Sequence, residues 1–155
     1  MACSSMSISR TLRVLFAIGA ISLIATTVSN AAPPEDSGFA IYSDVCYHPA
    51  EGDLLGTRVV LLRLKDADYV VYQMAEGELG KPQIGTATVD PKKGDILFKV
   101  AAGDSNEPVA TFRGKIAAQA LTGSFDNSNW TNRKGEKTFR LPRIVGRQQS
   151  YPVCD

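Results

Sequence analysis

Residues 112–125 read FRGKIAAQALTGSF, and this stretch carries the strongest fold signal in the chain. Its two halves mirror each other around residues 117–120, with apolar or glycine residues at every second position. A hairpin that turns there places matching residues opposite one another on one face. The expected pairs are Ile116 with Leu121, Gly114 with Gly123, and Phe112 with Phe125. Facing glycines remove side chains from the middle of that face, so the sheet bends sharply and favours a closed barrel.

The chain on both sides of this hairpin also has the pattern of short strands. From residue 39 onward, stretches rich in Val, Ile, Thr, Tyr and Phe are separated by Gly, Asp, Asn and Pro. Turn signals at residues 66–68, 77–78, 92–95 and 103–106 make successive strands antiparallel neighbours. We therefore predict an all-β fold, a single antiparallel up-and-down barrel of about eight strands with little helix. The expected strands cover residues 39–48, 55–65, 69–75, 83–89, 95–101, 109–117, 120–125 and 138–144.

The composition excludes several classes of protein. The 155 residues are 44% hydrophobic and 21% charged, with 17 basic and 16 acidic side chains. This length fits one domain, and the apolar fraction is too high for intrinsic disorder. The near-neutral charge lacks the basic excess of a dedicated nucleic-acid binder, so we expect no nucleic acid as partner.

The N-terminal residues have the three parts of a secretory signal peptide. Arg10 and Arg13 precede an apolar run over residues 14–28, and small residues follow at Ser29 and Ala31. The alternative is a retained membrane anchor, which needs about 20 apolar residues, whereas this run is shorter and interrupted by hydroxyls.

We predict a signal peptide over residues 1–31, a flexible leader over 32–38 and the barrel domain over 39–155. We also expect a periplasmic or secreted location, without stable membrane insertion.

Two cysteines remain once Cys3 leaves with the signal peptide. In an oxidising compartment, Cys46 and Cys154 are expected to form one disulfide that staples the C-terminal tail to the first strand. The alternatives are metal binding or a nucleophilic thiol, and these need further ligands or a nearby base.

The size, the signal peptide, the strand count and the hairpin over residues 112–125 resemble the calycin barrels, which are the lipocalins and avidins. The resemblance covers residues 39–144. The chain departs from both groups, because residues 39–48 lack the tryptophan that lipocalins carry near their first strand. Avidin pockets use several tryptophans, whereas Trp130 stands alone. Neither biotin binding nor a particular lipocalin ligand is implied.

The sequence lacks a convincing catalytic motif. Gly103-Asp104-Ser105 resembles the nucleophile block of one class of secreted esterases, but it is followed by another expected strand, and a turn accounts for these residues. The single histidine, His48, lies upstream, whereas that class places its base near the C-terminus.

The sequence gives little support for a metal site or for catalysis by paired carboxylates. Cys46-x-His48 supplies at most two ligands where a metal site needs three or four. Two close carboxylate pairs could support glycoside cleavage, but they fall at expected hairpin ends, where solvated turn residues are common. These pairs are Asp66 with Asp68 and Glu76 with Glu78. We expect no enzyme activity, no cofactor and no metal.

Positive charge is concentrated in residues 133–147, where six basic side chains, among them Arg140 and Arg143, accompany Glu136 as the only acid. One interpretation is a solvated edge strand that Lys and Arg protect from aggregation. The other is a surface that docks an anionic envelope component or an acidic partner.

Aromatic side chains supply two further candidate sites. Trp130 lies in a polar loop, where it could anchor a partner or cover the open end of the barrel. The loop sequence Asn129-Trp130-Thr131 is also a formal glycosylation acceptor. Tyrosines in the first three strands could line a pocket at the barrel mouth, or serve as ordinary strand residues. They are Tyr42, Tyr47, Tyr69 and Tyr72.

Together these patterns predict an exported, non-enzymatic and monomeric binding protein. It would hold a small amphipathic ligand in the barrel or bind a protein partner at its loops. The alternative is a secreted inhibitor of a hydrolase, which would insert a rigid loop into the cleft of its target. The residues expected to contact a ligand or partner are Trp130, Tyr69, Tyr72, Arg140 and Arg143. A polar-lined interior would favour the ligand, and a filled core with one rigid loop would favour the inhibitor.

Overall fold

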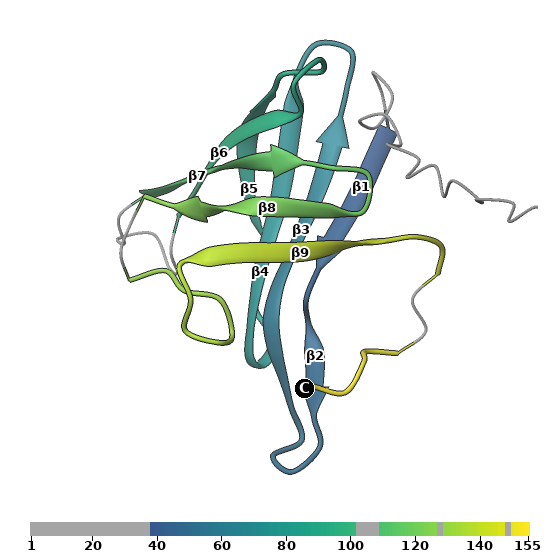
Figure 1. Ribbon diagram of the computed structural model, residues 1–155, viewed down its shortest axis with the longest axis vertical. Helices are drawn as coiled ribbons and strands as arrows, with labels where there is room; N and C mark the ends of the chain where they lie inside the picture. The colour runs from purple at the N-terminus through teal and green to yellow at the C-terminus, as the bar shows by residue number, and fades with distance from the viewer. Residues whose placement is uncertain (1–37, 102–108, 127–128, 148–149) are drawn as a thin grey trace, which may run out of the picture.

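The computed structural model describes residues 38–101, 109–126, 129–147 and 150–155, and these residues form an antiparallel sheet rolled into a barrel (Figure 1). No helix occurs within the described ranges. The strands are β1 (Gly38–Ser43), β2 (Cys46–His48), β3 (Asp53–Arg63), β4 (Asp68–Leu79), β5 (Gln83–Val89), β6 (Asp95–Ala101), β7 (Val109–Ile116), β8 (Ala120–Phe125) and β9 (Thr138–Ile144). The expected signal peptide, most of the leader and the Gly103-Asp104-Ser105 turn lie outside the described residues.

Successive strands pair with one another from β3 to β9, and β1 closes the barrel by pairing with both β3 and β9. β1 and β2 together occupy the expected first strand, so the barrel is the predicted eight-stranded, up-and-down one. The closure is uneven. β1 pairs with β3 over all six of its residues, but with β9 only through Ile41 opposite Ile144 and Tyr42 opposite Arg143. We call this β1–β9 contact the seam.

The β7–β8 hairpin has the predicted register, including the facing pair Gly114 and Gly123. The ring of Phe112 occupies the space that the two glycines leave. A Cβ atom added at Gly114 would lie 2.5 Å from this ring and 2.3 Å from the Thr122 carbonyl oxygen. The glycines therefore let an aromatic ring lie flat on the inner surface of a bent sheet.

Aromatic side chains fill the barrel interior. Phe98 stacks on Phe112 with ring centroids 4.7 Å apart, and Phe125 meets Tyr72 and Phe139 edge to face. All five are buried. Each such side chain stabilises the fold by about 1.5–3 kcal/mol through burial alone. The interior is thus a packed core lined by apolar rings.

The expected first strand is interrupted at Asp44 and Val45. The Asp44 side chain accepts a hydrogen bond from the Thr57 backbone N–H at 2.6 Å, which holds the interruption against β3. Gly56 makes room for it with φ +123°, since a Cβ atom there would lie 2.8 Å from the Asp44 carbonyl oxygen. The bend separates β2 from β1 and carries β2 below the barrel (Figure 1).

One predicted turn is wrong. Gly77 and Glu78 lie inside β4, which continues to Leu79, because β3 begins at Asp53 and Gly77 pairs with Leu54. The β3–β4 hairpin is therefore longer than its sequence pattern suggested. The turn of this hairpin lies close to its predicted position at residues 66–68, because β3 ends at Arg63 and the turn follows.

Candidate functional site

The surface feature with the most supporting contacts is the segment between β8 and β9, of which residues 126 and 129–137 are described. We call it the 129–137 loop. It lies beside the lower half of β4 (Figure 1), and it lines two depressions on the outside of the molecule. Three sets of contacts hold it in place, namely an internal hydrogen-bond network, an aromatic contact with the core and a group of ion pairs.

Asn132 organises the loop from within. Its side-chain oxygen accepts hydrogen bonds from the backbone N–H groups of Lys134 at 2.9 Å and Glu136 at 3.0 Å. Its amide nitrogen donates to the Glu136 carboxylate and to the Thr138 carbonyl oxygen, both at 2.9 Å. The Gly135 N–H donates back to the Asn132 carbonyl oxygen, closing a tight turn. One side chain thus satisfies two backbone N–H groups of the loop and the Thr138 carbonyl oxygen.

Trp130 fastens the loop to the barrel. Its ring centroid lies 4.3 Å from that of Phe125 and 5.5 Å from that of Tyr72, and the side chain is only partly exposed. It packs against the hydrophobic core, as a side chain that covers the end of the barrel would. The indole therefore covers this end of the aromatic interior.

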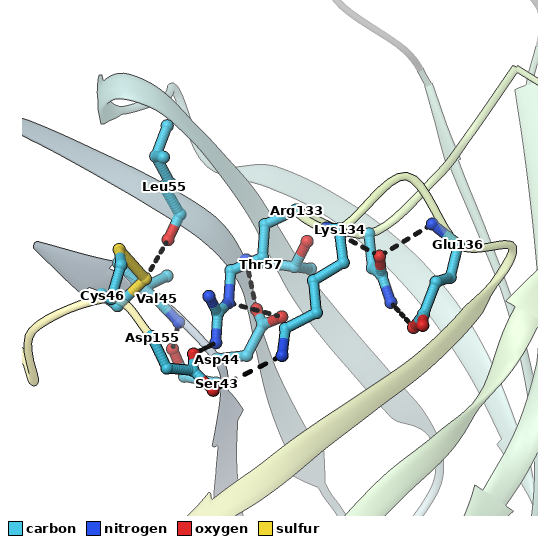
Figure 2. A network of polar contacts seen from close by, with 12 residues as sticks. Ser43, Asp44, Val45, Cys46, Leu55, Thr57, Arg133, Lys134, Glu136 and Asp155 are labelled. Carbon is cyan, nitrogen blue, oxygen red and sulfur yellow. Dashed lines mark hydrogen bonds and ion pairs between the residues drawn. A yellow bond between two sulfur atoms is a disulfide. The ribbon is translucent and has the colours of Figure 1, made fainter. Parts of the chain in front are cut away.

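Arg133 joins the loop to two distant parts of the chain. Figure 2 shows its guanidinium between Asp44 and Asp155. The Nε atom lies 3.9 Å from the Asp44 carboxylate, and the Asp155 carboxylate accepts a hydrogen bond from a terminal guanidinium nitrogen. The Lys134 ammonium lies 3.4 Å from Asp155 as well. Arg133 and Asp44 are both mostly buried, with side-chain exposures of 18% and 15%.

The pKa values of the two carboxylates are shifted in opposite directions. Burial raises the pKa of Asp44, although the Thr57 N–H and the Arg133 charge oppose that effect. The hydrogen bond from Arg133 lowers the pKa of Asp155 to about 2. Asp155 is therefore ionised, and paired with Arg133, over the whole physiological range.

The predicted disulfide brings Asp155 to this position. The sulfur atoms of Cys46 and Cys154 are bonded at 2.08 Å, with their Cα atoms 5.0 Å apart. Beside it, the Tyr47 N–H donates to the Pro152 carbonyl oxygen at 2.7 Å and the Cys154 N–H donates to the Tyr47 carbonyl oxygen at 2.9 Å. The tail thus lies along the outer edge of β2, as the sequence indicated.

The loop separates two surface depressions of similar size. The Glu76 depression has a volume of about 320 Å³ and lies between the loop and the β3–β4 hairpin, where Leu55, Met74 and Glu76 contribute to its wall. The Arg140 depression has a volume of about 300 Å³ and lies between the loop and the outer face of β9, with Arg140 and Pro142 in its wall. Asn132 and Arg133 line both.

The structure does not bring the candidate tyrosines together. Tyr42 and Tyr72 point into the core, and burial raises the pKa of both hydroxyls. Tyr69 is three residues from Tyr72 on the same strand and therefore points to the outer face, while Tyr47 is exposed on β2. In the described part of the barrel, the four tyrosines are therefore divided between the core and the outer surface.

The basic segment is less positive in space than in sequence, because Asp44 and Asp155 pair with Arg133 and Lys134. In the described ranges no carboxylate pairs with Arg140 or Arg143. These two arginines point to opposite faces of β9. Arg140 alternates with the buried Phe139 and Leu141 and faces outward, whereas Arg143 lies opposite the buried Tyr42 at the seam. They do not belong to one patch.

Of the remaining polar candidates, His48 and Asp68 have ion-pair partners. His48 lies 3.7 Å from Glu51, and Asp68 pairs with the buried Arg63 at 3.1 Å. Glu76 and Glu78 are exposed residues of β4. Across the residues that the structure describes, no group of three possible metal ligands is found. In the same residues no helix is long and apolar enough to cross a membrane.

Asp44 and Asp155 were not among the residues singled out from the sequence. The expected disulfide places Asp155 near the first strand, because it follows Cys154 directly. Nothing in the sequence connects either aspartate with Arg133, since Asp44 lies 133 − 44 = 89 residues before it and Asp155 lies 155 − 133 = 22 residues after it.

Comparisons with protein-family models, with curated proteins and with solved structures found no match to this chain.

Proposed function

We propose that this protein is an exported, non-enzymatic binding protein that engages a protein partner through the 129–137 loop and its two depressions. The observation that carries the proposal is the independent fastening of this loop by Trp130, Asn132 and Arg133. A loop held in one conformation loses little entropy when a partner binds, so more of the contact energy appears as affinity. The disulfide supports the oxidising location, and with the strand order it supports the calycin assignment.

The packed interior favours a partner over a ligand inside the barrel. Phe98, Phe112 and Phe125 line one wall on neighbouring strands. Phe125 on β8 also meets Tyr72 on the opposite strand β4, so rings fill the space where a lipocalin-type ligand would lie. A ligand there would have to displace rings that contribute to the core of the fold. The outer depressions need no such rearrangement, since the loop and the β-strands already form them.

The balance of charge favours an acidic or polar surface on the partner, because the wall of the Arg140 depression carries Arg133, Lys134 and Arg140 against Asp44 and Glu136. Arg140 is exposed on the wall of its depression, and Lys137 is exposed at the end of the loop. A carboxylate of the partner could enter the Arg140 depression without displacing the Arg133–Asp155 ion pair. Association would then be steered by charge and weakened by added salt.

Inhibition of a hydrolase is the second candidate function, and the rigidity of the loop favours it. A narrow, preorganised turn flanked by two hollows suits insertion into a cleft, with the walls of the cleft entering the hollows. The binding and inhibitor functions share the same surface and differ in whether the partner loses activity.

The test places a photo-crosslinking amino acid at Lys137, with Lys115 on the outer face of β7 as the matched exposed control. In the host's exported fraction we expect one defined protein adduct from position 137 and none from position 115. The captured protein is then purified and its affinity measured for the wild type, Arg140→Glu and the control Arg113→Glu, whose exposed arginine lies on β7.

We expect at least about a tenfold loss of affinity for Arg140→Glu only, as for a contact worth about 1.4 kcal/mol. Equal affinities for the two variants, or adducts from both positions alike, would contradict the proposal. If the captured protein is a hydrolase, its activity with and without the wild type separates inhibition from simple binding.

A further inference from the structure

A row of aliphatic side chains crosses the outside of the barrel on four neighbouring strands. Ile41 lies opposite Val60, Val60 opposite Val71, and Val71 opposite Ile84. All four point outward, because their neighbours along each strand point into the barrel. Ile84 is 76% exposed. The outer face of a barrel strand is normally polar, so this row needs an explanation.

A second row lies two residues farther along the same strands. Phe39 is opposite Leu62, Leu62 is opposite Tyr69, and Tyr69 is opposite Thr86. Phe39 is 68% exposed. Neither row contains a charged residue. Together they form a continuous uncharged surface over β1, β3, β4 and β5, which we call the outer apolar face. Surfaces of this kind on soluble proteins commonly mark an interaction site.

The order of residues in the first row indicates what covers this face. Across the four strands it reads Ile41, Val60, Val71, Ile84, which is the same in both directions. A twofold axis parallel to the strands, between β3 and β4, would set Val60 of one copy against Val71 of the other. The same axis would set Ile41 against Ile84. A symmetric dimer needs a patch that can pack against itself, because both copies use the same one. In the second row the same axis would set Phe39 against Thr86 and Leu62 against Tyr69, which are also uncharged contacts.

We propose that the outer apolar face is the interface of a symmetric homodimer, in which two copies pack sheet against sheet. Two uncharged faces can meet without burying an unpaired charge, and aligned sheets of twisted strands pack about 10 Å apart. Arg58 and Gln73 follow the first row on the side away from the second and supply part of a polar rim. This departs from the monomer expected from the sequence.

The size of the face sets the expected affinity. Four strands span about 15 Å, since neighbouring strands lie about 4.8 Å apart, and the two rows are about 7 Å apart along the strands. The apolar centre is therefore smaller than the roughly 800 Å² per partner of a standard stable interface. We expect a reversible dimer with a dissociation constant in the micromolar range.

The experiment is sedimentation velocity on the exported protein from about 1 μM to about 1 mM, a range that brackets micromolar affinity. We expect the wild type to pass from monomer to dimer across this range. Ile84→Lys should weaken dimerisation at least about tenfold, because it places a charge in the apolar centre. Ser124→Lys is the matched control, since it adds the same charge to the outer face of β8, away from the rows.

Thermal unfolding of both variants checks that each retains the fold. A wild type that stays monomeric throughout, or equal dimerisation of both variants, would overturn the dimer. Co-sedimentation of a monomeric wild type with zwitterionic phosphatidylcholine vesicles, lost in Ile84→Lys, would instead assign the face to a membrane surface. None of these measurements involves the 129–137 loop, so their failure is separate from failure of the proposed function.

Discussion

The β7–β8 hairpin and the 129–137 loop are near neighbours in sequence but are held by opposite kinds of contact. In the hairpin, Phe112 and Phe125 face each other across a single turn, and the glycines between them fix the bend. In the loop, Arg133 depends on Asp44 and Asp155, which the chain brings from its two ends. A local pattern specifies the first region, whereas the second exists only once the barrel and the disulfide have formed.

Removing the disulfide should have the largest effect and should act on the two regions unequally. For Cys46→Ala with Cys154→Ala, we expect a loss of about 2–5 kcal/mol in the free energy of unfolding, measured by denaturant titration. Hydrogen exchange should accelerate in the tail and around Arg133 well before it does so in β7 and β8. Equal acceleration in both regions would contradict the distinction between them.

Adding a methyl group between β7 and β8 should destabilise the locally specified region. At Gly123, a Cβ atom would lie 2.3 Å from the Arg113 carbonyl oxygen and 2.6 Å from the Phe112 ring. We expect Gly123→Ala to cost about 1–3 kcal/mol, as overpacked cores do. Ser124→Ala is the neighbouring control and should change stability by less than about 0.5 kcal/mol. Comparable stabilities for the two variants would show that the glycines are not required.

Replacing Asn132 tests whether the loop is rigid by itself. Asn132→Ala removes the side-chain bonds to Lys134, Glu136 and Thr138, and we expect a stability loss of about 1 kcal/mol. The stronger effect should be local, with faster amide exchange over residues 133–136 and a shifted emission of Trp130. Thr131→Ala, at an exposed neighbour, should leave both readouts unchanged. A loop that stays protected without Asn132 would owe its order to the ion pairs alone.

Acid should release the tail with little effect on the hairpin. The pKa of Asp155 is lowered from 3.8 to about 2, so its contribution is complete above pH 3.8 and disappears as the pH falls through about 2. The raised pKa of Asp44 acts with the opposite sign, because ionising this buried group costs stability as the pH rises. The Arg133 side-chain NMR signals should therefore shift across this window in the wild type and less in Asp155→Asn.

The sequence was sufficient for features that depend on alternation or on a forced partner. The mirrored residues 112–125 determined the hairpin register, and the two cysteines outside the expected signal peptide left one possible bridge, Cys46 with Cys154. It was insufficient where a residue's role depends on a distant strand. The sequence around Gly77 is typical of a turn, but in the fold Gly77 pairs with Leu54 inside a strand. The polar sequence around Trp130 predicts an exposed side chain, but in the fold Trp130 packs on Phe125 and Tyr72.

The outer apolar face shows the same limit in another form. Phe39, Val60 and Val71 are ordinary strand residues when each strand is read alone. Only the pairing of β1, β3, β4 and β5 aligns the outward residues into rows. The Asp44–Arg133–Asp155 ion pairs likewise join three segments that share no local pattern. Strand content and core were therefore predictable, and surfaces built across strands were not.

The seam described for the barrel determines how the shell comes apart. Two residue pairs join β1 to β9, fewer than the three between β5 and β6 and the six between β1 and β3, so the seam is the thinnest contact around the cylinder. Under thermal fluctuation or pulling, β1 should stay with β3 while the wall unzips beside Ile144. The protein would then pass through an open sheet in which β1, β3 and β4 stay paired. The disulfide between Cys46 and Cys154 would still link the C-terminal tail to β2.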